Sequence, residues 1–108
     1  MSPPFQPPYY AVIFISKLTD NTEGYHQTAE RMVELAQTMP GFLGLESARE
    51  EAGITVSFWK NESSIQNWKQ QAEHLLAQKA GIEKWYASYE MHIARVERYK
   101  NFNSGAIR

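Results

Sequence analysis

Residues 9–17 read YYAVIFISK, a β-branched and aromatic run that predicts a β-strand. Side chains alternate between the two faces of a strand, and here both alternating sets are apolar: Tyr10, Val12 and Phe14 in one, Ala11, Ile13 and Ile15 in the other. A sheet with helices on one face only would leave the second set in water. We therefore expect helices to cover one face of this strand and the sheet of a second subunit to cover the other.

A helix and a hairpin are predicted after this strand. Turn-forming residues occupy Thr19–Glu23, and apolar residues then recur at helical spacing over residues 25–36. Phe42–Glu50 and Ile54–Lys60 have the composition of two strands. We expect them to pair as a hairpin around Gly53, because glycine can take the positive φ that such a turn needs.

A second helix and a last strand complete the predicted order. Asn61 or Ser63 can cap this helix, Gly81 is expected to end it, and the last strand is expected to run over about residues 88–99. The apolar stripe of the helix is Ile65, Trp68, Ala72, Leu75 and Leu76. The order β-α-β-β-α-β predicts a ferredoxin-like α+β fold, with an antiparallel sheet and both helices on one face.

The composition indicates one globular domain flanked by two short segments. The chain has 108 residues, of which 43% are hydrophobic, enough for a single two-layer core. Four prolines among residues 1–8 favour an extended arm. The domain is expected to span residues 9–99, and residues 100–108, which show no periodicity, are expected to form a tail.

Charge and cysteine content exclude several classes of function. The formal net charge is −1, without a basic run, so nucleic acid is not an expected partner. No cysteine is present, which excludes disulfides and thiolate metal sites and suits a reducing cytoplasm. The N-terminus lacks the features of a signal peptide, and the apolar run Ala11–Ile15 is too short to cross a membrane. We expect a cytoplasmic protein without a membrane partner.

Three short motifs resemble one known family. These are PGFLGLES at residues 40–47, SFWK at residues 57–60, and a tryptophan followed six residues later by a histidine, Trp68 and His74. Together they resemble the antibiotic biosynthesis monooxygenase family of dimeric α+β barrels. The resemblance implies a homodimer that oxygenates a small aromatic or quinol-like compound, such as an anthrone, without metal, flavin or other cofactor.

Such a reaction needs little from the protein, because a substrate deprotonated to a delocalised anion can itself give an electron to oxygen. The pocket must hold a flat aromatic molecule, exclude water, and place a few hydrogen-bonding groups. His74 and Trp68 are the candidate catalytic residues. The candidate substrate-binding residues are Phe14, Gln71, Gln78, Trp85 and Tyr86.

The direction of the His74 side chain stays open at the level of sequence. On a straight helix His74 would lie roughly 150° from the middle of the apolar stripe and would face water. A kink near Ala72, or a partner subunit, would instead place it in a cavity. Trp68 also has two interpretations, a core residue or a residue of the pocket wall, and a core tryptophan can be both.

Two alternatives to the oxygenase remain. The first is a non-catalytic dimer that binds a small apolar ligand, which needs only apolar walls. The second is a heme-binding or heme-degrading protein. The resemblance implies that the site of such family members consists of an asparagine on the first strand, a tryptophan on the second helix, and a histidine ten residues after that tryptophan. Trp68 matches that tryptophan, but Gln78 stands at the histidine position and Phe14 near the asparagine position. An amide is a poor heme ligand, so we expect no heme and no metal site.

Overall fold

The structure is a computed structural model that describes residues 6–104. Residues 1–5 of the expected arm and 105–108 of the expected tail lie outside the described residues. The elements are β1 (Tyr9–Leu18), α1 (Tyr25–Gln37), β2 (Phe42–Arg49), β3 (Gly53–Trp59), α2 (Glu62–Gln70), α3 (Ala72–Ala80), a π-helical turn (Gly81–Trp85) and β4 (Tyr86–Val96). The predicted α+β, ferredoxin-like order is confirmed, with the second helix divided into α2 and α3.

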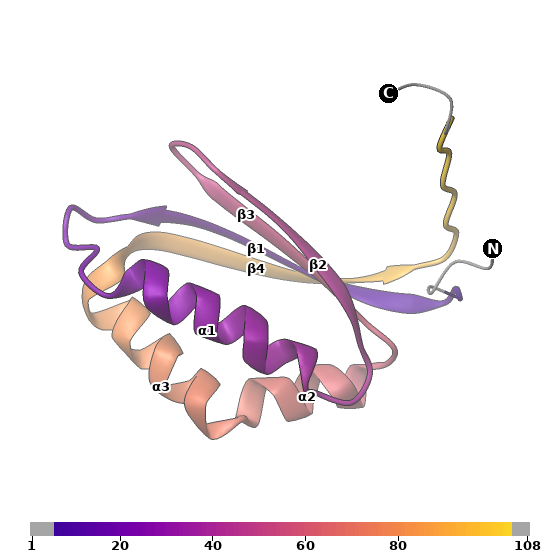
Figure 1. The fold of residues 1–108 in the computed structure, drawn as a ribbon, viewed down its shortest axis with the longest axis horizontal. Helices are drawn as coiled ribbons and strands as arrows, with labels where there is room; N and C mark the ends of the chain where they lie inside the picture. Colours follow the sequence, from indigo (N-terminus) through magenta and orange to yellow (C-terminus); the bar gives the residue numbers. More distant parts are fainter. Residues whose placement is uncertain (1–5, 105–108) are drawn as a thin grey trace.

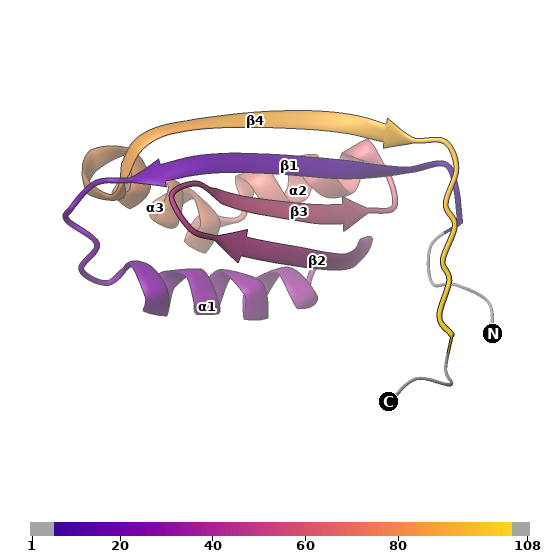
Figure 2. The same ribbon diagram turned by 90° about the horizontal axis from the view of Figure 1, so that it is seen from above.

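The four strands form one antiparallel sheet in the order β2-β3-β1-β4. The strands make one layer and the three helices a second layer on one side of it (Figures 1 and 2). Two register pairs fix the ends of the central strands: Tyr10 lies opposite Trp59, and Ser16 lies opposite Gly53. Strands β2 and β4 are the two edges of this sheet, and among residues 6–104 each has one side without a strand partner.

The core between sheet and helices is centred on Trp59, whose side chain is fully buried. Its ring contacts Phe42 of β2 at 5.2 Å and Trp68 of α2 at 5.9 Å between ring centroids. Leu35 of α1 and Ile65 of α2 are buried beside this core. Because Trp59 contacts a helix, its face of the sheet is the helix-covered one, and its neighbours in register, including Tyr10 and Ser16, share that face.

Arg49 joins the far end of the sheet to α1. Its Nη2 donates to Ser16 Oγ at 2.6 Å and to Tyr25 Oη at 3.2 Å, and its Nη1 donates to the Ser16 carbonyl at 3.3 Å. The guanidinium lies over the Cα of Gly53, where a Cβ would collide with it. The expected positive φ at Gly53 was wrong: the glycine lies within β3, and it is needed there as space for Arg49.

The opposite face of the sheet, which no helix within residues 6–104 covers, is apolar along the central strands β1 and β3 and carries charged or polar residues on the edge strands. Ile13 and Ile15 of β1 and Val56 of β3 are partly exposed there, and Ile54 is 45% exposed. Only the end of this face is closed, where Tyr9 is buried against Phe58 and Tyr99. The two apolar sets of β1 are thus present as expected, while a second subunit over the outer set stays a prediction.

Two expectations about the second helix were wrong. The apolar stripe does not continue past Trp68, because the helix is interrupted at Gln71; Leu75 and Leu76 are 48% and 69% exposed. The helical backbone also does not stop at Gly81 but continues as the π-helical turn to Trp85. The cap is Asn61, whose Oδ1 accepts a hydrogen bond from the Ser64 backbone N–H at 2.8 Å. Within residues 6–104, the helices are all too short or too polar to cross a lipid bilayer.

Candidate functional site

The break between α2 and α3 is built by Gln71. Its ψ of 129° is extended rather than helical, so the backbone changes direction after Gln70. Its amide still donates to the Trp68 carbonyl at 3.1 Å, and its own carbonyl accepts from the Leu75 amide at 2.9 Å. Its side-chain Oε1 accepts from the His74 amide at 3.0 Å and thereby caps α3.

This break turns His74 onto Trp68. The two rings are stacked, with centroids 4.1 Å apart and planes inclined by 16°. His74 Nδ1 lies 2.9 Å from the Trp68 carbonyl oxygen. A carbonyl only accepts, so Nδ1 must carry the hydrogen, and in the neutral ring Nε2 is left with a free lone pair. Of the two directions left open by the sequence, the structure has the kinked one.

The surroundings of His74 favour its neutral form. Burial lowers the pKa of the imidazole below its ordinary value, and the hydrogen bond to the Trp68 carbonyl opposes this only in part. The adjacent carboxylate of Glu73 does not bind the imidazole, because it accepts two hydrogen bonds from Arg31 of α1, at 2.6 Å and 2.9 Å. At neutral pH His74 is therefore an uncharged base held in one tautomer.

A second aromatic cluster lies where β4 begins. Phe14 of β1 contacts Tyr86 and Tyr89 at 5.4 Å and 5.3 Å between ring centroids, and Tyr86 contacts Tyr25 of α1 at 6.2 Å. Burial, and then the neighbouring Tyr25, raise the pKa of Tyr86 to about 12, so this phenol stays protonated at neutral pH. On the same face, the β4 side chains Tyr89, Met91 and Ile93 are about half exposed. These three side chains form a half-exposed apolar row along β4.

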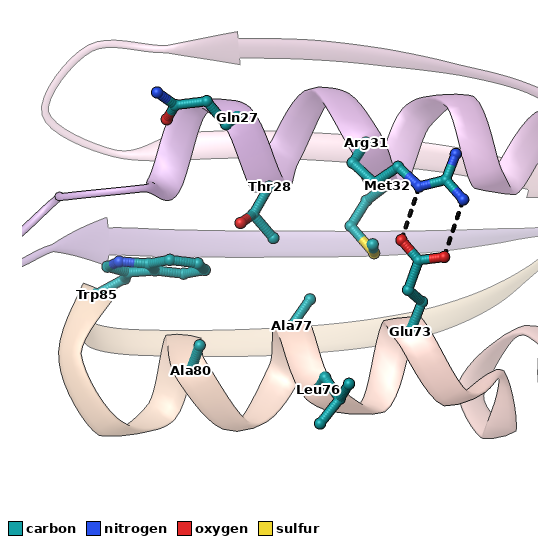
Figure 3. Close-up of a pocket in the computed structure, with 9 residues that line it drawn as sticks. All are labelled: Gln27, Thr28, Arg31, Met32, Glu73, Leu76, Ala77, Ala80 and Trp85. Carbon is teal, nitrogen blue, oxygen red and sulfur yellow. Dashed lines mark hydrogen bonds and ion pairs between the residues drawn. The ribbon is translucent and has the colours of Figure 1, made fainter.

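A groove of about 330 Å³ runs between α1 and α3 (Figure 3). The Trp85 ring closes one end, and the Arg31–Glu73 ion pair crosses the other. Trp85 is held by its Nε1, which donates to the Glu23 carbonyl at 2.9 Å. The volume is at the lower end of the range for small-ligand sites. The lining residues are Gln27, Thr28, Arg31, Met32, Glu73, Leu76, Ala77, Ala80 and Trp85.

The candidate residues thus fall into three places. Trp68, Gln71 and His74 form one cluster, Phe14 and Tyr86 belong to the second, Trp85 lines the groove, and Gln78 is half-buried on α3. The sequence did not predict that Arg31 and Glu73 line the groove and pair across it, because no local pattern links residues 42 positions apart. Within residues 6–104, no three histidine, aspartate or glutamate side chains gather as a metal-binding group.

Comparisons with known proteins agree with this fold. The sequence model of the antibiotic biosynthesis monooxygenase family matches residues 8–80. The chain belongs to this family. It is 50% identical over 99 residues to "Uncharacterized protein YqjZ" of Bacillus subtilis (strain 168), and this match covers 90% of the present chain and 87% of YqjZ.

Two solved structures illustrate how well the family fold is kept at low identity. SnoaB, a cofactor-independent oxygenase from Streptomyces nogalater, superposes with a TM-score of 0.73 at 11% identity, over 85% of this chain and 96% of SnoaB. A conserved protein from Methanosarcina mazei Go1 superposes with a TM-score of 0.73 at 14% identity, over 82% of this chain and 92% of its own. At these identities the likeness concerns the fold.

Proposed function

We propose that this family member is a cofactor-independent monooxygenase acting on a small aromatic or quinol-like compound, with His74 as the base that removes the substrate proton. One observation carries the proposal. The hydrogen bond from His74 Nδ1 to the Trp68 carbonyl fixes the tautomer, and the lowered pKa keeps the ring neutral, so Nε2 is free to accept a proton. The function in the name of SnoaB supports the choice of reaction.

The reaction can be written for an anthrone. His74 Nε2 takes a proton from the methylene carbon, and the resulting delocalised anion gives electrons to O2, forming a carbon–oxygen bond as a peroxide. The peroxide loses water and leaves a carbonyl, so one oxygen atom enters the product and the other leaves in the water with the two methylene hydrogens. The atoms balance with O2 as the sole co-reactant.

The surroundings of His74 suit such a substrate. Trp68 lies parallel to the imidazole and is itself held by Trp59, which keeps the base from rotating. The half-exposed row on β4 and the aromatic rings beside it form a separate cluster that supplies further apolar surface on the helix side of the sheet. Trp68 accordingly acts as a support for His74, while Phe14 and Tyr86 belong to the proposed substrate-binding surface.

We also propose a homodimer in which a second copy covers the outer face of the sheet. The half-exposed Ile54 and the partly exposed Ile13, Ile15 and Val56 form an apolar strip along β1 and β3 on that face, and a twofold contact brings this strip onto itself. Members of this family are commonly dimeric, which supports a second copy of this chain as the partner on the outer face. The expected buried area is on the order of 2,000 Å² or more.

The base is tested by oxygen uptake with a hydroxyanthrone as substrate, using chelator-treated protein. His74→Ala should lower the rate roughly 10²- to 10⁴-fold, the usual range for loss of a general base. His26→Ala is the matched control, because His26 is exposed on α1, outside the cluster of Trp68, Gln71 and His74. Equal rates in the parent and in His74→Ala would remove His74 from the mechanism. Binding without oxygen uptake by the parent would favour the non-catalytic ligand-binding dimer.

The pH profile provides a second check. Only neutral His74 can accept a proton, so the rate should rise with pH through the pKa of His74 and level off above it. Because burial lowers that pKa, the half-maximal rate is expected below pH 6.5. A profile that is still rising steeply above pH 8 would point to a different base.

A further inference from the structure

We infer that Gln71 is a positioning residue for His74: by interrupting the helix and capping α3, it sets the imidazole on Trp68 with Nε2 free. The inference rests on the proposed role of His74 as the base. Its starting point is that three hydrogen bonds of Gln71 involve residues on both sides of the break: Trp68 before it, and His74 and Leu75 after it.

The stacking of His74 on Trp68 needs this interruption. In an uninterrupted α-helix, residues six apart are separated by about 9 Å along the axis and by about 120° around it. The observed ring centroids are 4.1 Å apart. No side-chain rotation on a straight helix brings two such rings into parallel contact, so the extended backbone at Gln71 is what makes the contact possible.

One carbonyl couples the break to the base. The Trp68 oxygen accepts both the Gln71 amide at 3.1 Å and His74 Nδ1 at 2.9 Å. The first bond closes the end of α2, and the second fixes the tautomer of the base. The Gln71 side chain then holds the first turn of α3 through the His74 amide. If the helix becomes continuous, the Trp68 carbonyl, the Gln71 side chain and the His74 ring can no longer make these hydrogen bonds to one another.

The local sequence makes the break depend on the Gln71 side chain. Residues 66–78, QNWKQQAEHLLAQ, contain no glycine or proline, and glutamine, alanine, leucine, lysine and glutamate all favour a continuous helix. Glutamine is also not among the strongly preferred N-cap residues. Removal of its oxygen should therefore shift the population toward the continuous helix, by a factor of roughly 5 to 30 for the loss of one cap.

The experiment compares two neutral substitutions. Gln71→Met keeps the length of the side chain but has no oxygen to accept from His74, whereas Gln71→Asn supplies a preferred N-cap group. Gln70→Ala is the control, since Gln70 is exposed at the end of α2. The readouts are the pKa of the His74 ring by NMR, assigned with His74→Ala, and the pH profile of oxygen uptake.

Gln71→Met should bring the His74 pKa back toward its ordinary value and lower the rate by up to about 5- to 30-fold, the change expected in the helix equilibrium. Gln71→Asn should restore both properties in part, and Gln70→Ala should stay close to the parent. If the methionine variant fails to fold, Gln71→Ala provides the same comparison. A His74 pKa and rate unchanged in the variant without the oxygen would overturn the inference. If the parent shows no oxygen uptake, the proposed function fails, and the NMR comparison alone still decides whether Gln71 positions His74.

Discussion

Gly53→Ala tests whether the space above this glycine is reserved for Arg49. A Cβ at residue 53 would occupy the position of the guanidinium, which must then leave Ser16 and Tyr25. The substitution brings no backbone strain of its own, because the φ of Gly53 is not positive. Its effect on stability should therefore come from the displaced arginine.

The magnitude follows from two opposing terms. Moving the guanidinium loses three hydrogen bonds from a charged donor; because Arg49 is half-buried and regains water, we take the net loss as about 1–2 kcal/mol. Replacing glycine by alanine within a strand, with no collision, stabilises by about 0.5–1 kcal/mol. Gly53→Ala should thus destabilise the parent but stabilise the Arg49→Ala variant. The sign of the effect reverses between the two backgrounds.

Urea unfolding of the parent, both single variants and the double variant completes a double-mutant cycle, which measures the coupling between residues 49 and 53. The expected coupling energy between residues 49 and 53 equals the lost arginine interaction, about 1–2 kcal/mol, which exceeds the deviation of about 0.3–0.5 kcal/mol seen for independent sites. Destabilisation by Gly53→Ala that is equal in both backgrounds would refute the reasoning. It would mean that the alanine disturbs the strand itself and that Arg49 does not depend on the glycine.

Three further outcomes are expected. Light scattering should give twice the 12.5 kDa chain mass at micromolar concentration, and Ile54→Asp on the outer face should return it to the monomer; a parent mass of 12.5 kDa would contradict the dimer. Hemin titration should give no Soret band that saturates at one heme per subunit; a saturating band lost in His74→Ala would support the heme alternative. Because the folded state raises the pKa of Tyr86 to about 12, the unfolded chain ionises first, so stability should fall from pH 10 to 12; Tyr86→Phe should reduce that fall, and an unchanged slope would contradict the shift.

The fold was predictable because its strands are long and their composition is unambiguous. The apolar composition of β1 and the hairpin between residues 42 and 59 together indicate an antiparallel sheet. The two helices that the sequence predicts then pack on one face of this sheet. The errors lie where the backbone departs from regular geometry. Gly81, where the π-helical turn begins, and Gly53 leave room for the Tyr86 ring and the Arg49 guanidinium, and no local pattern records these contacts.

The candidate site was less predictable for the same reason. The segment containing Gln71 and His74 is made of helix-forming residues, so its periodicity indicates one straight helix. The hydrogen bonds of Gln71 interrupt the helix despite this preference, and the break selects one of the two directions that the sequence left open for His74. The Arg31–Glu73 bridge joins two helices through residues far apart in sequence, and only their assembly brings them together.

The edge position of β4 has a consequence for how the subunit avoids aggregation. An edge strand of eleven residues offers a row of unpaired backbone groups to any other extended chain. Its residues include Glu90 and His92, whose side chains are hydrogen-bonded at 2.8 Å, and Arg95, which pairs with Glu97 at 3.0 Å. A foreign strand added at this edge would have to displace or desolvate these charges. These groups thereby oppose strand addition at an edge whose helix-side residues Tyr89, Met91 and Ile93 are apolar and half exposed.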